Sequence, residues 1–220
     1  MGMLKSIGIE KGRPFNPDAR TTEILELAIQ DAYDYMQDMF VKKAFSPFIE
    51  GTQWSNFNLS MAQAKAGWPF VTEERMLIDE RANLYHYATF MPKALGGGSF
   101  YLTSIFDSEG NLFDGESTYK LNVPADAPAK DFWSAIVYSF NTHGFIEGNE
   151  RVGISSLDKD NMQVNTDGSV DIYFSPSAPK GQVSNWVPTK EAFWVVLRLY
   201  GPEAAQVIKS WELPDIVKVK

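Results

Sequence analysis

The chain has 220 residues, of which 44% are hydrophobic and 22% charged, a composition typical of a globular protein of one large or two small domains. It contains no cysteine, which excludes disulfides, thiolate zinc sites, iron–sulfur clusters and cysteine nucleophiles. The formal net charge of −8 repels phosphate backbones, so we expect no nucleic-acid partner.

The sequence also contains no candidate for a membrane span or a leader. No window approaches the ~20 apolar residues that a membrane span needs, and the first residues lack the charged-then-apolar pattern of a signal peptide. We therefore expect no membrane partner and a cytoplasmic location for the chain as written. A periplasmic or secreted location would require a signal peptide outside this sequence.

The N-terminal part is expected to consist of a linker-like segment, residues 1–16, and a helical region, residues 17–95. Asn16 and Pro17 are typical of a helix N-cap and first turn, and apolar residues then recur at helical spacing to residue 45. Thr72 is expected to cap a second helix that ends near Phe90.

The C-terminal part, residues 96–220, is expected to be a β domain, because the apolar period changes to about two after the glycines at 96–98. The predicted strands are 100–106, 118–123, 132–141, 162–165, 170–174 and 193–200. Asp167-Gly168 predicts a tight hairpin turn. Two of the strands are apolar on both faces, as a strand between two layers is. We predict an α+β fold in which an antiparallel β-sandwich carries an N-terminal pair of helices.

The two histidines are the first candidates for chemistry, because the standard catalytic sequence motifs are absent. A metal site would have to use His86, His143 and carboxylates such as Glu147, but His143 and Glu147 lie in a turn and share no helical face. The acidic turn at 107–116 could offer calcium ligands, yet Gly110 is misplaced for an EF-hand loop. We expect no metal and no cofactor. A structural role for His86 and a role as general base both stay open.

Polar residues embedded in apolar segments form the second set of candidates. Arg198 lies inside a strongly apolar strand, Arg151 follows Asn149, and Asn185 precedes Trp186. A charged group in such a place must be paired or must face a wet pocket, because burying it alone is costly. Two arginines and an amide that converge would suit a carboxylate, a sugar or another polar ligand. The alternative is a structural arginine–carboxylate pair that holds the two sheets together.

Many of these positions belong to a family resemblance that covers most of residues 80–220. The chain resembles the C-terminal part of an uncharacterised, mostly bacterial family in which two "domain of unknown function" modules, twelve-fifty-four and twelve-fourteen, occur in tandem. The matching runs include Asp107-Ser108-Glu109-Gly110, Tyr119-Lys120-Leu121, Phe132-Trp133-Ser134, Asn149 with Arg151, Asp167-Gly168-Ser169, Asn185-Trp186 with Pro188, and Arg198-Leu199-Tyr200 with Pro202.

The resemblance implies a β-sandwich of jelly-roll character, commonly in an oligomeric protein, with no agreed activity, cofactor or catalytic residues. Residues 7–18 resemble the segment that joins the two modules. One departure concerns Tyr138-Ser139, where such sequences tend to place Tyr-Asp. If that Asp partners Arg151 or Arg198 in the family, the arginine must find another acceptor here.

Three functions are compatible with the sequence. The first is a β-sandwich module that binds a small polar or carbohydrate-like ligand through Arg151, Asn185, Trp186 and Arg198, or that positions substrate beside another domain or subunit. The second is a cofactor-independent hydrolase or lyase with His86 or His143 as base and Glu147 or Asp114 as its partner. The third is a structural or assembly domain. The expected partners are a small molecule and either further copies of the chain or an N-terminal module.

Overall fold

The computed structural model describes residues 2–57, 70–87, 98–158 and 160–219. The chain consists of two compact units, residues 1–39 and 40–220. The first unit contains α1 (Gly2–Ser6) and most of α2 (Ala19–Lys43). α2 confirms the predicted long helix, but Asp18 rather than Asn16 caps it, because its Oδ1 accepts a hydrogen bond of 2.7 Å from the Thr21 N–H.

In the second unit, helix α4 (Ile78–Tyr87) starts later than predicted. The hydroxyl of Thr72 accepts hydrogen bonds from the N–H groups of Glu74 and Arg75, inside a turn that is closed by a bridge between Val71 and Met76. Thr72 therefore stabilises this turn and does not cap the helix. The predicted helix end near Phe90 lies outside the described residues.

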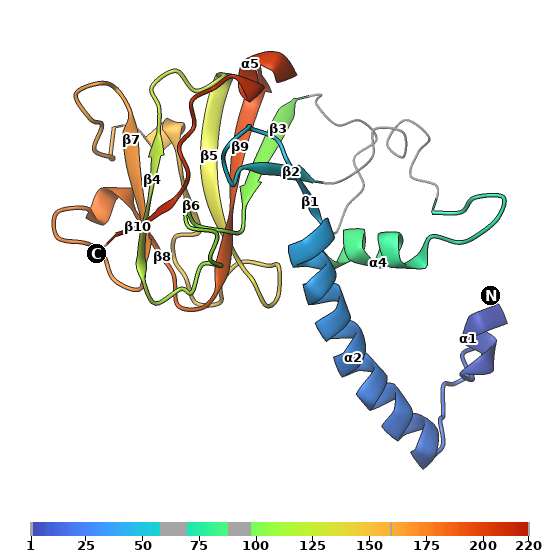
Figure 1. Cartoon of the computed structure of the whole chain (residues 1–220). Coiled ribbons are helices and arrows are strands. Elements are labelled where there is room, and N and C mark those ends of the chain that lie inside the picture. Colours follow the sequence, from blue (N-terminus) through green and yellow to red (C-terminus); the bar gives the residue numbers. More distant parts are fainter. Residues whose placement is uncertain (1, 58–69, 88–97, 159, 220) are drawn as a thin grey trace. The chain divides into compact units, whose positions relative to one another are not determined.

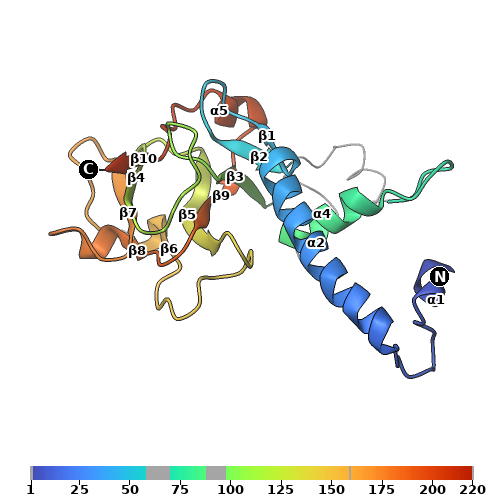
Figure 2. The same cartoon turned by 60° about the horizontal axis from the view of Figure 1, so that its bottom comes forward.

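Two sheets form the body of the second unit, and Figures 1 and 2 show them as two layers. The six-stranded sheet is antiparallel and has the order β1 (Phe45–Pro47), β2 (Ser55–Phe57), β3 (Ser99–Ser104), β9 (Phe193–Pro202), β5 (Ala129–Ser139), β6 (Gly153–Ser155). The four-stranded sheet has the order β10 (Val217–Val219), β4 (Thr118–Val123), β7 (Val170–Ser175), β8 (Trp186–Pro188), and β7 pairs with β8 in parallel. The short helices are η1 (Ser156–Asp158), η2 (Val183–Asn185) and α5 (Ala205–Lys209).

The main core lies between the sheets, and the central strand β9 shows how the pleat divides its residues. Phe193, Val195, Leu197 and Leu199 belong to this core. Trp194 and Val196 belong to a second apolar cluster, with Phe40, Ala44 and Ile105, on the outer face of the six-stranded sheet. The prediction that this strand is apolar on both faces is therefore confirmed. Arg198 and Tyr200 continue the outer face, because successive side chains of a strand alternate.

The predicted turn at Asp167-Gly168 is present, but residues 162–165 form no strand. Gly168 has a φ of +84°, and the Asn165 N–H donates to the Ser169 carbonyl across the turn. The main chain of Gln163 is instead hydrogen-bonded at both its N–H and its carbonyl to the side chain of Asn185. A side-chain amide thus takes the place of a neighbouring strand.

The α+β class with two sheets is confirmed, whereas the jelly-roll character stays a prediction. Residues 17–95 hold helices α2 and α4, as expected, and also the short strands β1 and β2. Three-residue strands are too short to show a period of two, which is why β1, β2, β6, β8 and β10 were not predicted. Among the described residues, no helix is both long and apolar enough to cross a membrane.

Candidate functional site

Three of the four predicted ligand-binding residues meet where β6 approaches β8. The Nη1 of Arg151 donates to the carbonyls of Val183 and Trp186, at 3.2 and 3.0 Å. The indole Nε1 of Trp186 donates to the Ser175 carbonyl at 2.9 Å. The predicted convergence of Arg151 with Asn185-Trp186 is therefore present, but its partners are main-chain carbonyls.

Asn185 is the centre of this junction and is only 2% exposed. Its Oδ1 accepts a hydrogen bond from the Gln163 N–H at 2.7 Å, and its Nδ2 donates to the carbonyls of Gln163 and Asp171 at 2.8 Å. Both donors of the amide are used, and its oxygen is occupied. Asn185 thus joins three segments of main chain and has no polar atom left for a ligand.

A surface pocket of about 400 Å³ lies beside the junction, over β6. Its wall carries one arginine, two carboxylates and an amide, and the lining residues include Ile136, Glu150, Arg151, Ser155, Asp158 and Asn161. One of these carboxylates, that of Asp158, already accepts a hydrogen bond from the Ser155 N–H at 3.1 Å. The pocket therefore has mixed charge and no single sign to select a ligand.

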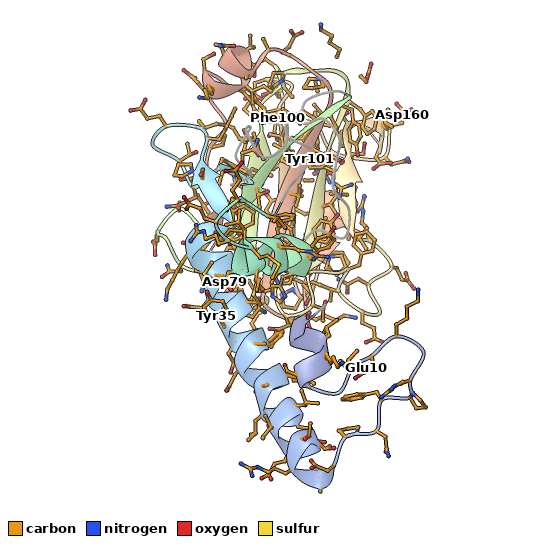
Figure 3. All side chains as sticks on the ribbon, turned by 90° about the vertical axis from the view of Figure 1, so that its right-hand side faces the viewer. Glu10, Tyr35, Asp79, Phe100, Tyr101 and Asp160 are labelled. Carbon is orange, nitrogen blue, oxygen red and sulfur yellow. The ribbon has the colours of Figure 1, made fainter. Side chains whose placement is uncertain are left out.

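Arg198, the fourth predicted ligand-binding residue, lies on the outer face of the six-stranded sheet. In the β-sheet register it is flanked by Tyr101 of β3 and Ser134 of β5. Its Nη2 donates to the hydroxyl of Tyr138. The guanidinium carbon lies 5.3 Å from the centre of the Tyr101 ring and 5.8 Å from that of Tyr138, so cation–π attraction holds it between two rings. Figure 3 labels Tyr101 and its neighbour Phe100, which packs against the main core.

Among the residues that the structure describes, the buried Nε of Arg198 and the buried Oγ1 of Thr103 have no hydrogen-bond partner, and both belong to this face. Thr103 is 1% exposed and lies two residues along β3 from Tyr101. Because the register sets Tyr101 opposite Arg198, Thr103 and Arg198 are diagonal neighbours on one face. Most buried polar groups in proteins are paired, so two orphans side by side require an explanation.

The charge of Arg198 has no acidic partner in the part of the chain that the structure describes. Burial raises the pKa of Tyr138 above its ordinary value, despite the opposing effect of the Arg198 charge. Tyr138 is therefore uncharged at pH 7 and contributes a hydroxyl, not an anion.

The two histidines also come together, from α4 and from the turn after β5. Their ring centres are 4.4 Å apart, and His143 adopts a positive φ of 55°. The His143 ring also packs against Phe40, at 4.3 Å. Burial lowers the pKa of His86, and burial together with the His86 charge lowers the pKa of His143 to about 3. Both imidazoles are neutral at pH 7, but a group with a pKa of about 3 is a weak general base.

The carboxylates predicted to assist the histidines have other surroundings. Glu147 is exposed. Asp114 accepts hydrogen bonds from the N–H groups of Glu116 and Ser117 and from the ammonium of Lys218. Although burial alone would raise its pKa, these hydrogen bonds hold the pKa of Asp114 well below its ordinary value. Asp114 thus stabilises a turn and attaches β10 to it.

The acidic turn at 107–116 is likewise stabilised by hydrogen bonds from main-chain N–H groups to a carboxylate. Asp107 is 1% exposed, and its Oδ1 accepts hydrogen bonds from the N–H groups of Glu109 and Asn111. Within the ranges that the structure describes, no three His, Asp or Glu side chains come together as metal ligands would.

Sequence reasoning missed Thr103, Tyr101 and the contact of Tyr138 with Arg198. The available signal was the alternation of side chains along each strand, which places these residues on the same face as Arg198 once the strand register is known. The register itself cannot be read from the sequence. The family departure at Ser139 does not concern Arg198. Ser139 pairs with Phe193 and faces the main core, whereas Arg198 faces outward.

Residues 98–204 match the family model described as "Protein of unknown function (DUF1214)". This match confirms the resemblance to the C-terminal module. No curated protein matches the chain.

Two solved structures resemble the whole or most of the chain. The VPA0106 protein from Vibrio parahaemolyticus is 18% identical, with a TM-score of 0.50, and the match covers 100% of this chain and 50% of that protein. An uncharacterised protein from Burkholderia cenocepacia is 13% identical, with a TM-score of 0.38, over 88% of this chain and 49% of that one. The first likeness shows the fold alone, and this chain spans about half the length of the proteins it matches.

Proposed function

We propose that this chain, which carries a DUF1214 domain over residues 98–204, is a binding module for a small polar ligand. The ligand would sit on the outer face of the six-stranded sheet, with Arg198 as its main contact. Tyr101 and Tyr138 would flank it and fix its orientation through ring faces and hydroxyls. This moves the predicted site away from Arg151, Asn185 and Trp186, whose polar atoms bind main chain.

One observation supports the proposal above the others, the unpaired and buried Nε–H of Arg198 beside the unpaired hydroxyl of Thr103. A buried donor without a partner costs about 1–3 kcal/mol, and more when the group is charged. A ligand that accepts hydrogen bonds from both groups would recover that free energy on binding. The module would then hold a ligand without forming or breaking a covalent bond.

The test is a thermal-shift screen of the purified chain against sugars, carboxylates and phosphate esters. A ligand at a hundredfold excess over Kd stabilises the folded state by about 2.7 kcal/mol. Arg198→Met should abolish the shift, while Arg151→Met, the matched control, should lower the melting temperature but keep the shift. A screen without any shift, or a shift that survives Arg198→Met, would reject the proposal.

A second candidate function rests on the contact between His86 and His143. We propose as the alternative a cofactor-independent hydrolase or lyase in which His86 acts as base, since its ring is half-buried and the pKa of His143, at about 3, makes His143 a weak base. The test is turnover on esters, amides and glycosides by the native chain and by His86→Gln. If the native chain turns over none of them, the alternative has no support.

The role of the module in a longer assembly is also a proposal. The chain spans about half of the solved structures that it matches, so we propose that it works beside an N-terminal module or further copies of itself. Exposed apolar side chains on α2, among them Ile24, Leu27 and Ile29, support an assembly role. Several connections cross from one sheet to the other, among them those from β3 to β4, from β4 to β5 and from β8 to β9, and these crossings support a jelly-roll description of the sandwich.

A further inference from the structure

The charges around Arg198 on the outer face restrict the class of ligand that this face can bind, and this inference rests on the proposed function. Arg198 lies between two aromatic side chains and has no acidic partner among the described residues. A neutral ligand such as a sugar could accept its hydrogen bonds but would leave the positive charge uncompensated. Removing an uncompensated charge from water is expensive, and an anion lowers that cost.

In the described strands, the positions paired with Arg198 and Val196 carry no carboxylate that could act as an internal anion. The residues opposite Arg198 are Tyr101 and Ser134, and those opposite Val196 are Thr103 and Ile136. The side chains that reach the guanidinium on this face are therefore aromatic, aliphatic or hydroxyl-bearing. The site offers hydrogen-bond donors and one positive charge.

The donors are arranged for a flat group with two oxygen atoms. The Nε–H and Nη2 of an arginine lie along one edge of a planar fork that matches the geometry of a carboxylate. Nη2 also donates to the Tyr138 hydroxyl, whose own proton then remains to be donated. Thr103 is a diagonal neighbour of Arg198 across this strand pair, and the Cα atoms of diagonal neighbours are about 7–8 Å apart.

A monoanion fits this site better than a dianion. A single guanidinium can compensate one negative charge, and a phosphate monoester carries nearly two at pH 7. The formal net charge of the chain is −8, so the average field opposes the approach of a second negative charge. From these observations we infer that the ligand of the Arg198 site is a small monocarboxylate held by the Nε edge of Arg198, with Tyr138 and Thr103 as further donors.

Isothermal titration of the full chain with a matched pair of probes tests this inference. Benzoate and benzamide have the same ring and nearly the same shape, but only benzoate carries the charge. Phenyl phosphate and methyl glucoside represent the dianionic and the neutral polar classes. We expect benzoate to bind at least about tenfold more tightly than benzamide, phenyl phosphate or the glucoside, because hydrogen bonds to charged groups are the stronger ones. Added salt should weaken the binding of benzoate.

Variants then place the binding at Arg198. Arg198→Lys keeps the charge but loses the planar fork, so we expect benzoate binding to weaken about tenfold or more, and Arg198→Met should abolish it. Tyr138→Phe should weaken it less. Arg151→Met, which leaves the outer face unchanged, should bind benzoate as the native chain does. Circular dichroism identifies any variant that is not folded, and Arg198→Lys still decides the question if Arg198→Met is unfolded.

The outcomes distinguish a failure of the carboxylate inference from a failure of the proposed binding site. If benzamide or the glucoside binds as tightly as benzoate and depends on Arg198, the proposed function stands and the carboxylate inference is wrong. If phenyl phosphate binds best in an Arg198-dependent way, the inference of a monoanion is likewise wrong. If none of the four probes binds, or if benzoate binding is unchanged in Arg198→Met and Arg198→Lys, the Arg198 site itself is rejected.

Discussion

Two regions of the β-sandwich handle buried polar groups in opposite ways. At the junction beside β6 and β8, Arg151, Asn185 and Trp186 are all hydrogen-bonded to main chain. On the outer face of the six-stranded sheet, Arg198 and Thr103 each keep a buried polar atom without a partner. In both regions the sequence places a polar residue in an apolar segment. Only the surroundings of that residue in the folded protein distinguish a structural role from a binding role.

Convergence of polar side chains is therefore not sufficient evidence for a binding site. The junction is the better internal support, because every polar atom of the Asn185 amide is occupied. The outer face has fewer polar groups but a surplus of donors. Free energy left unrealised in the folded protein is available to a ligand.

Asn185→Leu should give the largest effect and tests the supporting role of the junction. The substitution would remove, from a side chain that is itself buried, the partners of the N–H and carbonyl of Gln163 and of the carbonyl of Asp171. We expect the free energy of unfolding to fall by about 4 kcal/mol. Urea unfolding measures it, and a loss below about 1 kcal/mol would contradict the role given to this amide.

Acid should destabilise the protein through His143, whose ring packs against Phe40 of the apolar cluster on the outer face. Its pKa is about 3 in the folded protein and 6.5 ordinarily, so below pH 6.5 the unfolded chain binds a proton that the folded chain does not. The free energy of unfolding should therefore fall as the pH drops from about 6.5 towards 3, by about 2–3 kcal/mol at pH 4 after allowance for partial exposure. His143→Gln should remove this part of the slope, and an unchanged slope would show that the histidine stays uncoupled from folding.

Arg151→Met should destabilise the protein less than Asn185→Leu. Two carbonyls lose a charged donor, but part of the side chain lies near the surface and water can replace it. A loss of about 2 kcal/mol in the free energy of unfolding is expected. A neutral result would mean that the guanidinium has no supporting role, and would weaken the contrast with Arg198.

Thr103→Val should have the opposite sign. The exchange replaces a buried hydroxyl that has no partner by a methyl group of similar size, so it removes a desolvation cost. We expect a gain of about 1 kcal/mol in the free energy of unfolding. A loss of stability would show that the hydroxyl is paired in solution, for instance with bound water.

Arg198→Met should leave stability nearly unchanged, within about 1 kcal/mol, because the arginine has one hydrogen bond to lose and an uncompensated charge to remove. Chemical unfolding of the two methionine variants under the same conditions gives the direct comparison with Arg151. If Arg198→Met costs as much as Arg151→Met, then Arg198 is a structural residue like the other.

The sequence predicted the regular and long elements of the fold because their periods extend over many residues. The long N-terminal helix and the strands near Thr118, Val170 and Phe193 are found where expected. The predicted strand at 162–165 is absent, since its neighbour is the side chain of Asn185, about twenty residues away, rather than another strand. No local pattern encodes such a partner.

The sequence predicted only some of the residues of the candidate site. Arg198 was identified because a charge inside an apolar strand is conspicuous. Its separation from Arg151, and its position beside Tyr101 and Thr103, depend on the pairing of β3 with β9. Such pairing joins residues that are far apart in the chain, so spacing within one strand could not reveal it.

The central position of β9 in the six-stranded sheet has a consequence for folding during synthesis. Ser99 of β3 pairs with Tyr200, and Tyr138 of β5 pairs with Trp194, so during synthesis both strands leave the ribosome well before the strand that will separate them. Until then β3 and β5 expose edges and apolar side chains, the condition in which chains aggregate. Contacts across such distances also slow folding. We therefore expect the nascent chain to need protection, and a chain that ends before Phe193 to be insoluble.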